Sequence, residues 1–194
     1  MTIDSIRFHL RSKMIEVEIK VEVKNREKLE QILFESGFTK GELIREEDLY
    51  FDTIEDSIRK NDHALRIRCC EDYTAENSIS YLTHKGPKMD QISMTRAEHE
   101  VEISDAVTTI QILNSLGYTK QYPVIKHRQY FHKDSMTICI DQVENLGNFL
   151  EVEMIVENAS EKEKALEDIL KFLEMLGYSK DMLLRKSYLV MLQE

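Results

Sequence analysis

The sequence predicts an α+β protein built from about eight antiparallel strands and three amphipathic helices. Three observations support this fold class: long stretches in which apolar and charged residues alternate, apolar helix faces that end at glycine, and an internal repeat of helix and strand. The chain has 194 residues, which suits one domain, or two small ones tightly joined, and is enough to bury a core.

The first half begins with residues 15–24, where ten residues alternate apolar and charged without a break. That alternation is typical of a strand with one charged face. Asn25 can cap the helix that follows, and Gly37 ends that helix. A polar loop is expected over 53–62, and further strands are expected at about 43–52, 64–68 and 79–85.

The second half has the same kinds of element. Ser104 or Asp105 is expected to cap a second helix, which Gly117 ends. The last helix is expected to start with a capping box from Ser160 to Glu163 and to stop at Gly177. The remaining strands are expected at 96–103, 124–132, 136–141 and 149–156.

A repeat supports this assignment. Gly37-Phe38-Thr39-Lys40 precedes Tyr50-Phe51, and Gly117-Tyr118-Thr119-Lys120 precedes Tyr130-Phe131 with the same spacing. Two similar halves, each a strand, a helix and antiparallel strands, are the economical explanation. Tyr50, Tyr130 and Tyr188 are expected to be packing residues.

Charge and composition exclude some classes of protein. The chain has 36 acidic and 26 basic side chains, a net charge of −10, which argues against nucleic acid or an anionic membrane as partner. It has no run of about 18 apolar residues that would predict a transmembrane helix. Cys69, Cys70 and Cys139 lack zinc-type spacing, so we expect reduced thiols and a cytoplasmic location. Residues 1–13 are expected to form an N-terminal arm or extension, and 14–194 a single domain.

The charged strand faces recur along the chain and allow two architectures. A half-solvated sheet would present them to water. A closed barrel would instead turn the apolar faces outward under the helices and line its lumen with charge. Buried charges cost several kcal/mol each unless they are paired or bind a ligand, so such a lumen predicts a highly charged ligand with metal ions. The faces comprise Glu16, Glu18, Lys20, Glu22 and Lys24; Arg66 and Arg68; Arg96, Glu98, Glu100 and Glu102; Lys126 and Arg128; and Glu151 and Glu153.

The residues Glu16-Val17-Glu18-Ile19-Lys20 resemble the E-x-E-x-K signature of the CYTH superfamily, the triphosphate tunnel metalloenzymes. Two further segments, Lys85-Gly86-Pro87-Lys88 and Leu146-Gly147-Asn148-Phe149, are most similar to the class IV adenylyl cyclase branch. Other matches follow in the family's order: Asp48-Leu49-Tyr50-Phe51, Ala64-Leu65-Arg66-Ile67-Arg68, Arg96-Ala97-Glu98-His99-Glu100, Gly147-Asn148-Phe149-Leu150-Glu151-Val152-Glu153 and Arg185-Lys186-Ser187-Tyr188.

This resemblance implies an eight-stranded antiparallel β-barrel, a triphosphate tunnel, with about three flanking amphipathic helices. It implies Mg²⁺ or Mn²⁺ as cofactor, a triphosphate as substrate and a possible homodimer. Hard cations prefer carboxylate oxygens, and the expected metal-binding residues are Glu16, Glu18, Asp141, Glu151 and Glu153.

The implied substrate-binding residues are basic. Arginine binds phosphate with two parallel hydrogen bonds, whereas lysine acts as a point charge. Among them Lys85 and Arg128 are also expected to be catalytic, together with the carboxylates Glu18 and Glu153. The full expected clamp is Lys20, Arg66, Arg68, Lys85, Arg96, Lys126, Arg128 and Lys186.

The leading function is that of an adenylyl cyclase, which converts ATP to cyclic AMP and pyrophosphate. The alternatives are a triphosphatase that hydrolyses inorganic triphosphate, thiamine triphosphate or a nucleotide, and a non-catalytic triphosphate-binding module. Glu46 stands where relatives often have glutamine, and we expect it to lie away from the metal and phosphate ligands. The histidines show no ligand spacing, and His84 is expected to be a packed or surface imidazole.

Overall fold

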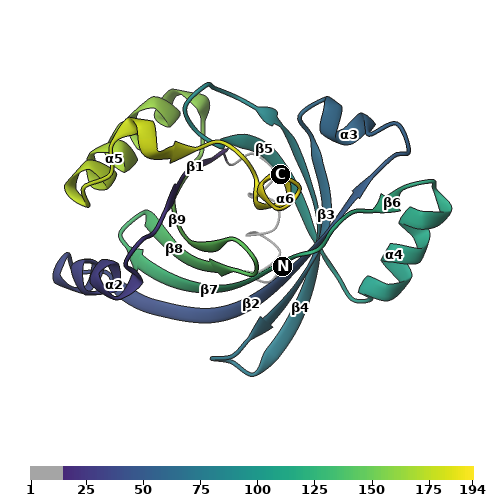
Figure 1. Ribbon diagram of the computed structural model, residues 1–194, viewed down its shortest axis with the longest axis horizontal. Coiled ribbons are helices and arrows are strands. Elements are labelled where there is room, and N and C mark those ends of the chain that lie inside the picture. The colour runs from purple at the N-terminus through teal and green to yellow at the C-terminus, as the bar shows by residue number, and fades with distance from the viewer. Residues whose placement is uncertain (1–14) are drawn as a thin grey trace, which may run out of the picture.

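A closed ring of antiparallel strands forms the centre of the molecule (Figure 1). The structure, a computed structural model, describes residues 15–194, so the expected arm at 1–13 lies outside the described residues. Eight strands follow one another around the ring as β1-β5-β4-β3-β2-β7-β8-β9, and β9 pairs again with β1. They are β1 (Ile15–Glu22), β2 (Thr39–Asp52), β3 (Ala64–Asp72), β4 (Asn77–Lys88), β5 (Arg96–Ile103), β7 (Val124–Lys133), β8 (Met136–Val143) and β9 (Gly147–Val156).

This closure decides between the two architectures that the alternation allows. β1 pairs with β9 over its whole length, from Ile15↔Val156 to Glu22↔Phe149, and the half-solvated open sheet is therefore excluded. The predicted eight-stranded barrel is confirmed. Two short strands extend it: β6 (Thr119–Lys120) pairs with β2, and β10 (Leu183–Leu184) pairs with β1.

Three long helices lie on the outside of the barrel (Figure 1). They are α2 (Arg26–Glu35), α4 (Ala106–Ser115) and α5 (Ala159–Met175). The predicted loop at 53–62 contains a short helix, α3 (Ser57–Lys60), and the C-terminal segment adds the 3₁₀ turn η1 (Lys180–Met182) and the helix α6 (Tyr188–Leu192). These short elements were missed because a single turn carries too little periodicity to be recognised.

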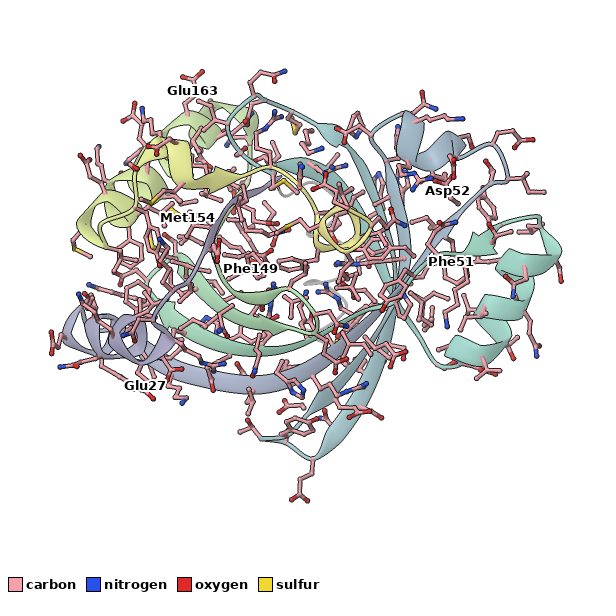
Figure 2. All side chains as sticks on the ribbon, viewed as in Figure 1. Glu27, Phe51, Asp52, Phe149, Met154 and Glu163 are labelled. Carbon is pink, nitrogen blue, oxygen red and sulfur yellow. The ribbon has the colours of Figure 1, made fainter. Side chains whose placement is uncertain are left out.

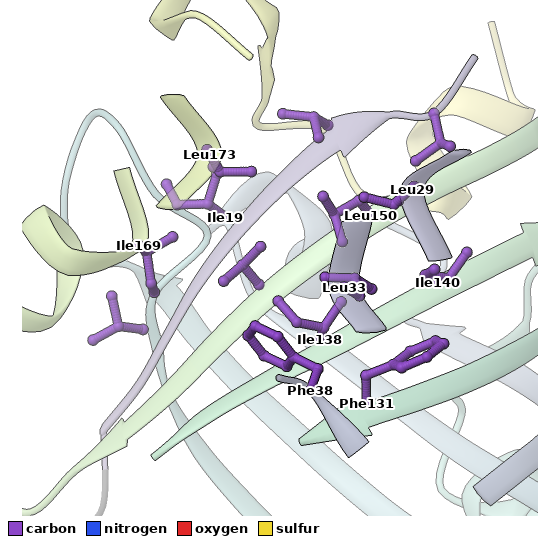
Figure 3. Packing of buried hydrophobic residues seen from close by; sticks show 14 of the residues in the cluster. Ile19, Leu29, Leu33, Phe38, Phe131, Ile138, Ile140, Leu150, Ile169 and Leu173 are labelled. Carbon is purple, nitrogen blue, oxygen red and sulfur yellow. The ribbon is translucent and has the colours of Figure 1, made fainter. Parts of the chain in front are cut away.

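The main hydrophobic core lies between the barrel wall and two of these helices (Figure 3). Leu29 and Leu33 of α2, with Ile169 and Leu173 of α5, pack on the outward apolar faces of the strands. The strand residues in this core are Val17, Ile19, Val21, Phe131, Ile138, Ile140, Leu150 and Val152. The alternating residues of the same strands consequently point into the lumen.

Two smaller hydrophobic cores complete the packing, one on the outer wall and one at an end of the lumen. Leu113 of α4 packs on Leu49, Phe51 and Ile67 of β2 and β3. At the C-terminus, Tyr188 and Leu189 of α6 pack with Val124, Val143 and Phe149. The last helix is thereby held against the ring by apolar contacts.

The helix ends agree with most of the sequence signals. Asn25 and Asp105 cap α2 and α4, since their side chains accept hydrogen bonds from the amides of Lys28 and Thr108. The capping box proposed from Ser160 to Glu163 is wrong: α5 begins earlier, with Asn158 as its N-cap residue and no side-chain cap bond. The three glycines that end the long helices have φ of +84°, +89° and +87°, which explains the repeated glycine of the two halves.

Candidate functional site

The barrel encloses a cavity of about 1060 Å³ that all the charged strand faces line. Figure 2 shows side chains crowding the inside of the ring, whereas Glu27 and Glu163 project from the outer helices. The lumen contains both signs of charge. Its basic residues include Lys20, Arg66, Arg68, Lys85, Lys126 and Arg128, and its acidic residues include Glu16, Glu18, Asp48, Glu98, Glu151 and Glu153.

Three carboxylates gather where β1 meets β9. Glu18 lies directly opposite Glu153, and Lys20 lies opposite Glu151 in the same register. One oxygen from each of Glu18, Glu151 and Glu153 lies within 4.8 Å of the others. Strands from opposite ends of the chain thus bring these carboxylates together.

The electrostatics of these carboxylates are unequal. Burial raises the pKa of Glu18 to about 7, and the charge of Glu151 adds to this shift. Burial also raises the pKa of Glu153, helped by the charge of Glu16. Burial alone would raise the pKa of Glu151, but Lys20 and Arg128 lower it overall. The positive charge near Glu18 and Glu153 is therefore too small to offset the cost of burying their ionised carboxylates.

The cluster fits a hard divalent cation. Within residues 15–194 the Glu18 carboxylate makes no hydrogen bond or ion pair, so its oxygens are available to a ligand. Mg²⁺ and Mn²⁺ prefer carboxylate oxygens, and a cation here would offset the repulsion that raises the pKa of Glu18 and Glu153.

The other two expected metal ligands are placed differently. Asp141 is fully buried and accepts two hydrogen bonds of 2.6 Å from Arg128 and one of 2.9 Å from Tyr188. Glu16 lies 3.9 Å from Nζ of Lys85, and burial raises its pKa. Neither belongs to the group of three carboxylates.

Most of the expected phosphate-binding residues surround the cavity in buried ion pairs. Arg128 contacts Glu151 and Asp141, and lies 3.5 Å from Glu153. Lys20 lies 3.0 Å from Glu151. Arginine and lysine are therefore interleaved with the carboxylate cluster at one end of the network.

A second set of cations lies on the strands across the lumen. Arg68 binds Asp48 through Nε at 2.6 Å and Nη2 at 2.8 Å, and Arg66 lies 3.3 Å from the same carboxylate. Lys85 lies 2.8 Å from Glu98. These pairs fix the basic groups in the largely buried lumen, where an unpaired charge would be costly.

Two expected clamp residues lie apart from this network. Arg96 donates to the carbonyl oxygens of Asp62 and Gly86 and to the Asp62 carboxylate, so its guanidinium ties together the loops at one end of the barrel. Lys186 is exposed at the cavity mouth, where its Nζ lies 2.5 and 2.7 Å from the two oxygens of Glu194. Both residues line the cavity, and Arg96 is as buried as Arg68, but neither forms an ion pair with the carboxylates of the central network.

Glu46 belongs to the site, and its expected position away from the phosphate-binding residues was wrong. The Glu46 carboxylate is 2% exposed and lies 2.9 Å from both Arg68 and Lys126. Burial alone would raise its pKa, but Arg68 and Lys126 lower it to about 2. A usable signal was present, because Glu46, Asp48 and Tyr50 share one face of β2 at period two.

Tyr188 also does more than pack. Its hydroxyl donates to Asp141 at 2.9 Å, and Nζ of Lys20 lies 3.9 Å from the centre of its ring. A cation over an aromatic face is an attractive contact. Helix α6 therefore contributes directly to the polar network.

The structure also bears on the expectations for the cysteines and for membrane-spanning helices. Cys69, Cys70 and Cys139 are free thiols. Among the helices of the described residues, none has the length and apolar character needed to span a bilayer.

Comparison with known proteins gives consistent matches. The model of the CYTH domain family matches residues 14–188. A Methanocaldococcus jannaschii protein named as a candidate adenylate cyclase is 42% identical over 176 residues, which cover 91% of this chain and 97% of that protein. Adenylate cyclase CyaB of Aeromonas hydrophila is 26% identical over 144 residues, 74% of this chain and 70% of that protein. The solved structure of the PH1819 protein from Pyrococcus horikoshii OT3 superposes with a TM-score of 0.82 and 35% identity, covering 92% of this chain and 98% of that one.

Proposed function

This chain belongs to the CYTH domain family, and we propose that it is a metal-dependent adenylyl cyclase that converts ATP to cyclic AMP and pyrophosphate. The observation that carries this proposal is the arrangement of charge in the lumen. Three carboxylates with oxygens within 4.8 Å of one another face a set of buried cations across one cavity. The names of the two relatives support the choice of reaction.

The basic residues act as the phosphate clamp. Arg66, Arg68 and Arg128 offer planar guanidinium groups that bind phosphate oxygens with two hydrogen bonds, and Lys20, Lys85 and Lys126 add point charges. Each already has a carboxylate partner. A triphosphate that enters the lumen replaces part of these contacts. Its binding therefore requires no further basic side chain to become buried.

Glu18, Glu151 and Glu153 are the groups that would hold the metal. A bound Mg²⁺ or Mn²⁺ would neutralise phosphate charge and make the ribose 3′-hydroxyl more acidic. The carboxylates keep this positive charge at one end of the clamp.

In the proposed reaction the ribose 3′-oxygen attacks the α-phosphorus. A new oxygen–phosphorus bond closes the cyclic phosphate while the bond from the α-phosphorus to the bridging oxygen breaks. The electron pair leaves with pyrophosphate, which Arg66, Arg68 and Lys85 stabilise by charge. The 3′-hydroxyl proton leaves to solvent in the cavity.

The test is an incubation of the full chain with ATP and Mn²⁺, with the products separated by chromatography. Equal amounts of cyclic AMP and pyrophosphate are expected, and chelation of the metal with EDTA should stop their formation. Release of orthophosphate without cyclic AMP would contradict the cyclase and assign a triphosphatase, for which tripolyphosphate and thiamine triphosphate are the next substrates. Binding of these compounds without turnover under either metal would contradict an enzymatic role.

A further inference from the structure

Three histidines, two from neighbouring strands and one from the residue before a third, meet on the outer wall of the barrel. His84 of β4 lies directly opposite His99 of β5, and the next pair in the register, Lys85↔Glu98, faces the lumen. Because side chains alternate between the two faces of a strand, His84 and His99 face outward, although His63 and His99 also border the cavity. His63 comes immediately before β3 and reaches the same place from the other side.

Their rings lie side by side. Nδ1 of His63 is 3.1 Å from Nε2 of His84, and the two ring centres are 5.2 Å apart. The His99 ring lies nearly parallel to that of His84, at 9° and with 6.3 Å between centres. His99 is exposed and His63 and His84 are half-buried, so solvent reaches the group.

The spacing of the first two nitrogens matches a coordination sphere. Metal–nitrogen bonds of about 2.0–2.1 Å place two neighbouring imidazole ligands about 3.0–3.4 Å apart. A hydrogen bond between two neutral imidazoles would give the same distance for His63 and His84. Such a hydrogen bond does not account for His99, the exposed imidazole on β5. The Cβ of His99 lies about 4.5–5.5 Å from that of His84, its cross-strand partner. As they stand, the ring nitrogens of these three histidines do not all lie within 4.8 Å of one another, so metal binding requires the His99 side chain to rotate toward the pair.

We propose that His63, His84 and His99 form a second metal site, on the outside of the barrel, for a borderline divalent transition metal such as Zn²⁺, Ni²⁺ or Cu²⁺. The donor set consists of nitrogen, which suits these ions, whereas the oxygen donors of the lumen suit Mg²⁺ and Mn²⁺. The remaining coordination positions face solvent and take water. The two sites therefore select different ions, and this proposal is independent of the proposed function.

The position of the site gives it a structural consequence. It joins β4 and β5 to the residue that precedes β3, and within residues 15–194 β5 has a single registered residue pair, Glu16↔Arg96, with its other neighbour β1. An ion bound only by the folded barrel stabilises it by mass action. A bound ion would thus link β5 to β4, the neighbour with which β5 is already paired over most of its length.

The experiment is a calorimetric titration of the full chain, without a polyhistidine tag, with Ni²⁺ in excess Mg²⁺, so that the lumen carboxylates do not contribute. We expect one Ni²⁺ per chain and an affinity at least about tenfold lower in His84→Gln. The matched control changes the three other histidines together, His9→Gln, His127→Gln and His132→Gln, and should keep the wild-type affinity.

A thermal unfolding series separates a lost ligand from a damaged fold. Without metal, His84→Gln and His99→Gln should unfold cooperatively as the wild type does. With Ni²⁺, the Tm should rise for the wild type and for the triple control, and should not rise for His84→Gln. Equal Ni²⁺ affinity in the wild type and His84→Gln, or no Ni²⁺ binding to the wild type, would overturn the proposal.

Discussion

At the level of single residues, Glu46 shows how the lumen holds its cations. Its carboxylate lies 2.9 Å from both Arg68 and Lys126 and is 2% exposed. The same negative charge that stabilises these two basic groups in the folded chain competes with a phosphate for them. Stability and ligand affinity are therefore opposed at this position.

Glu46→Gln should weaken the folded state and strengthen triphosphate binding. Removing one partner of a buried ion pair leaves excess positive charge and costs about 3–5 kcal/mol, so the Tm should fall. The freed charge on Arg68 and Lys126 should lower the Kd for tripolyphosphate roughly tenfold. The corresponding free energy is a modest part of the Coulomb attraction between a phosphate and a basic group in contact. Calorimetric titration with tripolyphosphate measures the second effect, and weaker binding by the variant would refute it.

Glu153→Gln tests the carboxylate cluster. Burial and the charge of Glu16 raise the pKa of Glu153, so a neutral amide removes little that stabilises the fold, and the Tm should equal or exceed that of the wild type. Loss of a direct ligand should reduce metal-dependent turnover by more than about 100-fold, since loss of an outer-shell partner costs about 10–100-fold. Glu157→Gln, an exposed position just beyond β9, is the matched control. Full activity of Glu153→Gln would remove Glu153 from the ligand set.

At the level of elements, the long strands and helices were predictable because each carries its own periodicity. The alternation at 15–24 predicted β1, and Asn25 and Gly37 marked the helix that follows. The elements that the sequence analysis missed depend on contacts with the rest of the chain. α6 is five residues long and is held by Tyr188 and Leu189 against distant strands.

The candidate site was predictable only in part for the same reason. Charged faces at period two place side chains in the lumen, but they do not say which groups pair. The pairing of Glu46 with Lys126 follows from the register of β2 and β7, and the meeting of His63, His84 and His99 follows from that of β3, β4 and β5. Register between strands is a property of the closed barrel and has no local signal in the chain.

The loop between β4 and β5 is tied to α5 through one carboxylate, which predicts a pH effect. Asp90 accepts hydrogen bonds from the amides of Ile92 and Ser93 and from Ser93 Oγ, and lies 2.7 Å from Nζ of Lys162. Burial alone would raise its pKa, but these contacts lower it below the usual value. A lowered pKa in the folded state stabilises the fold above the unfolded pKa of about 4, and this stability is lost as the pH falls through the folded pKa.

Asp90→Asn should therefore lower the free energy of unfolding by about 1 kcal/mol at pH 7, a value reduced for solvent screening. The difference in unfolding free energy from the wild type should narrow below about pH 4, because Asp90 then becomes protonated in the unfolded chain while it stays ionised in the folded one. Urea unfolding at pH 7 and pH 3 measures both values. Asp168→Asn, on the same helix as Lys162, is the control and should change the free energy of unfolding less. A difference in unfolding free energy between Asp90→Asn and the wild type that stays constant with pH would contradict the linkage.

At the level of the whole molecule, the barrel has one weak seam. Among the described residues, 15–194, β1 and β5 share a single registered pair, Glu16↔Arg96, whereas β1 and β9 are paired along all of β1. One further backbone bond, from the amide of Met94 to the carbonyl of Glu18, crosses near this seam. Side chains across the lumen therefore contribute to closure, and Lys85 of β4 lies 3.9 Å from Glu16 of β1.

A ligand that spans the lumen should close this seam. Tripolyphosphate with Mn²⁺ would contact the carboxylates of β1 and β9 together with Lys85 of β4 and Arg66 of β3, and opening between β1 and β5 would separate those groups. Such an opening becomes more costly by about 2.7 kcal/mol when the ligand is at 100 times its Kd, which slows exchange through it by about 100-fold.

Hydrogen exchange measured by mass spectrometry, with and without tripolyphosphate and Mn²⁺, tests this. Amides in 94–103 should slow more than those in the β8–β9 hairpin, because the hairpin is fully paired and its local openings leave the ligand contacts intact. Glu153→Gln, which loses a proposed metal ligand, should show little change in either segment. Equal slowing of both segments in the wild type would mean that the ligand acts only on global unfolding, and that the seam closes without it.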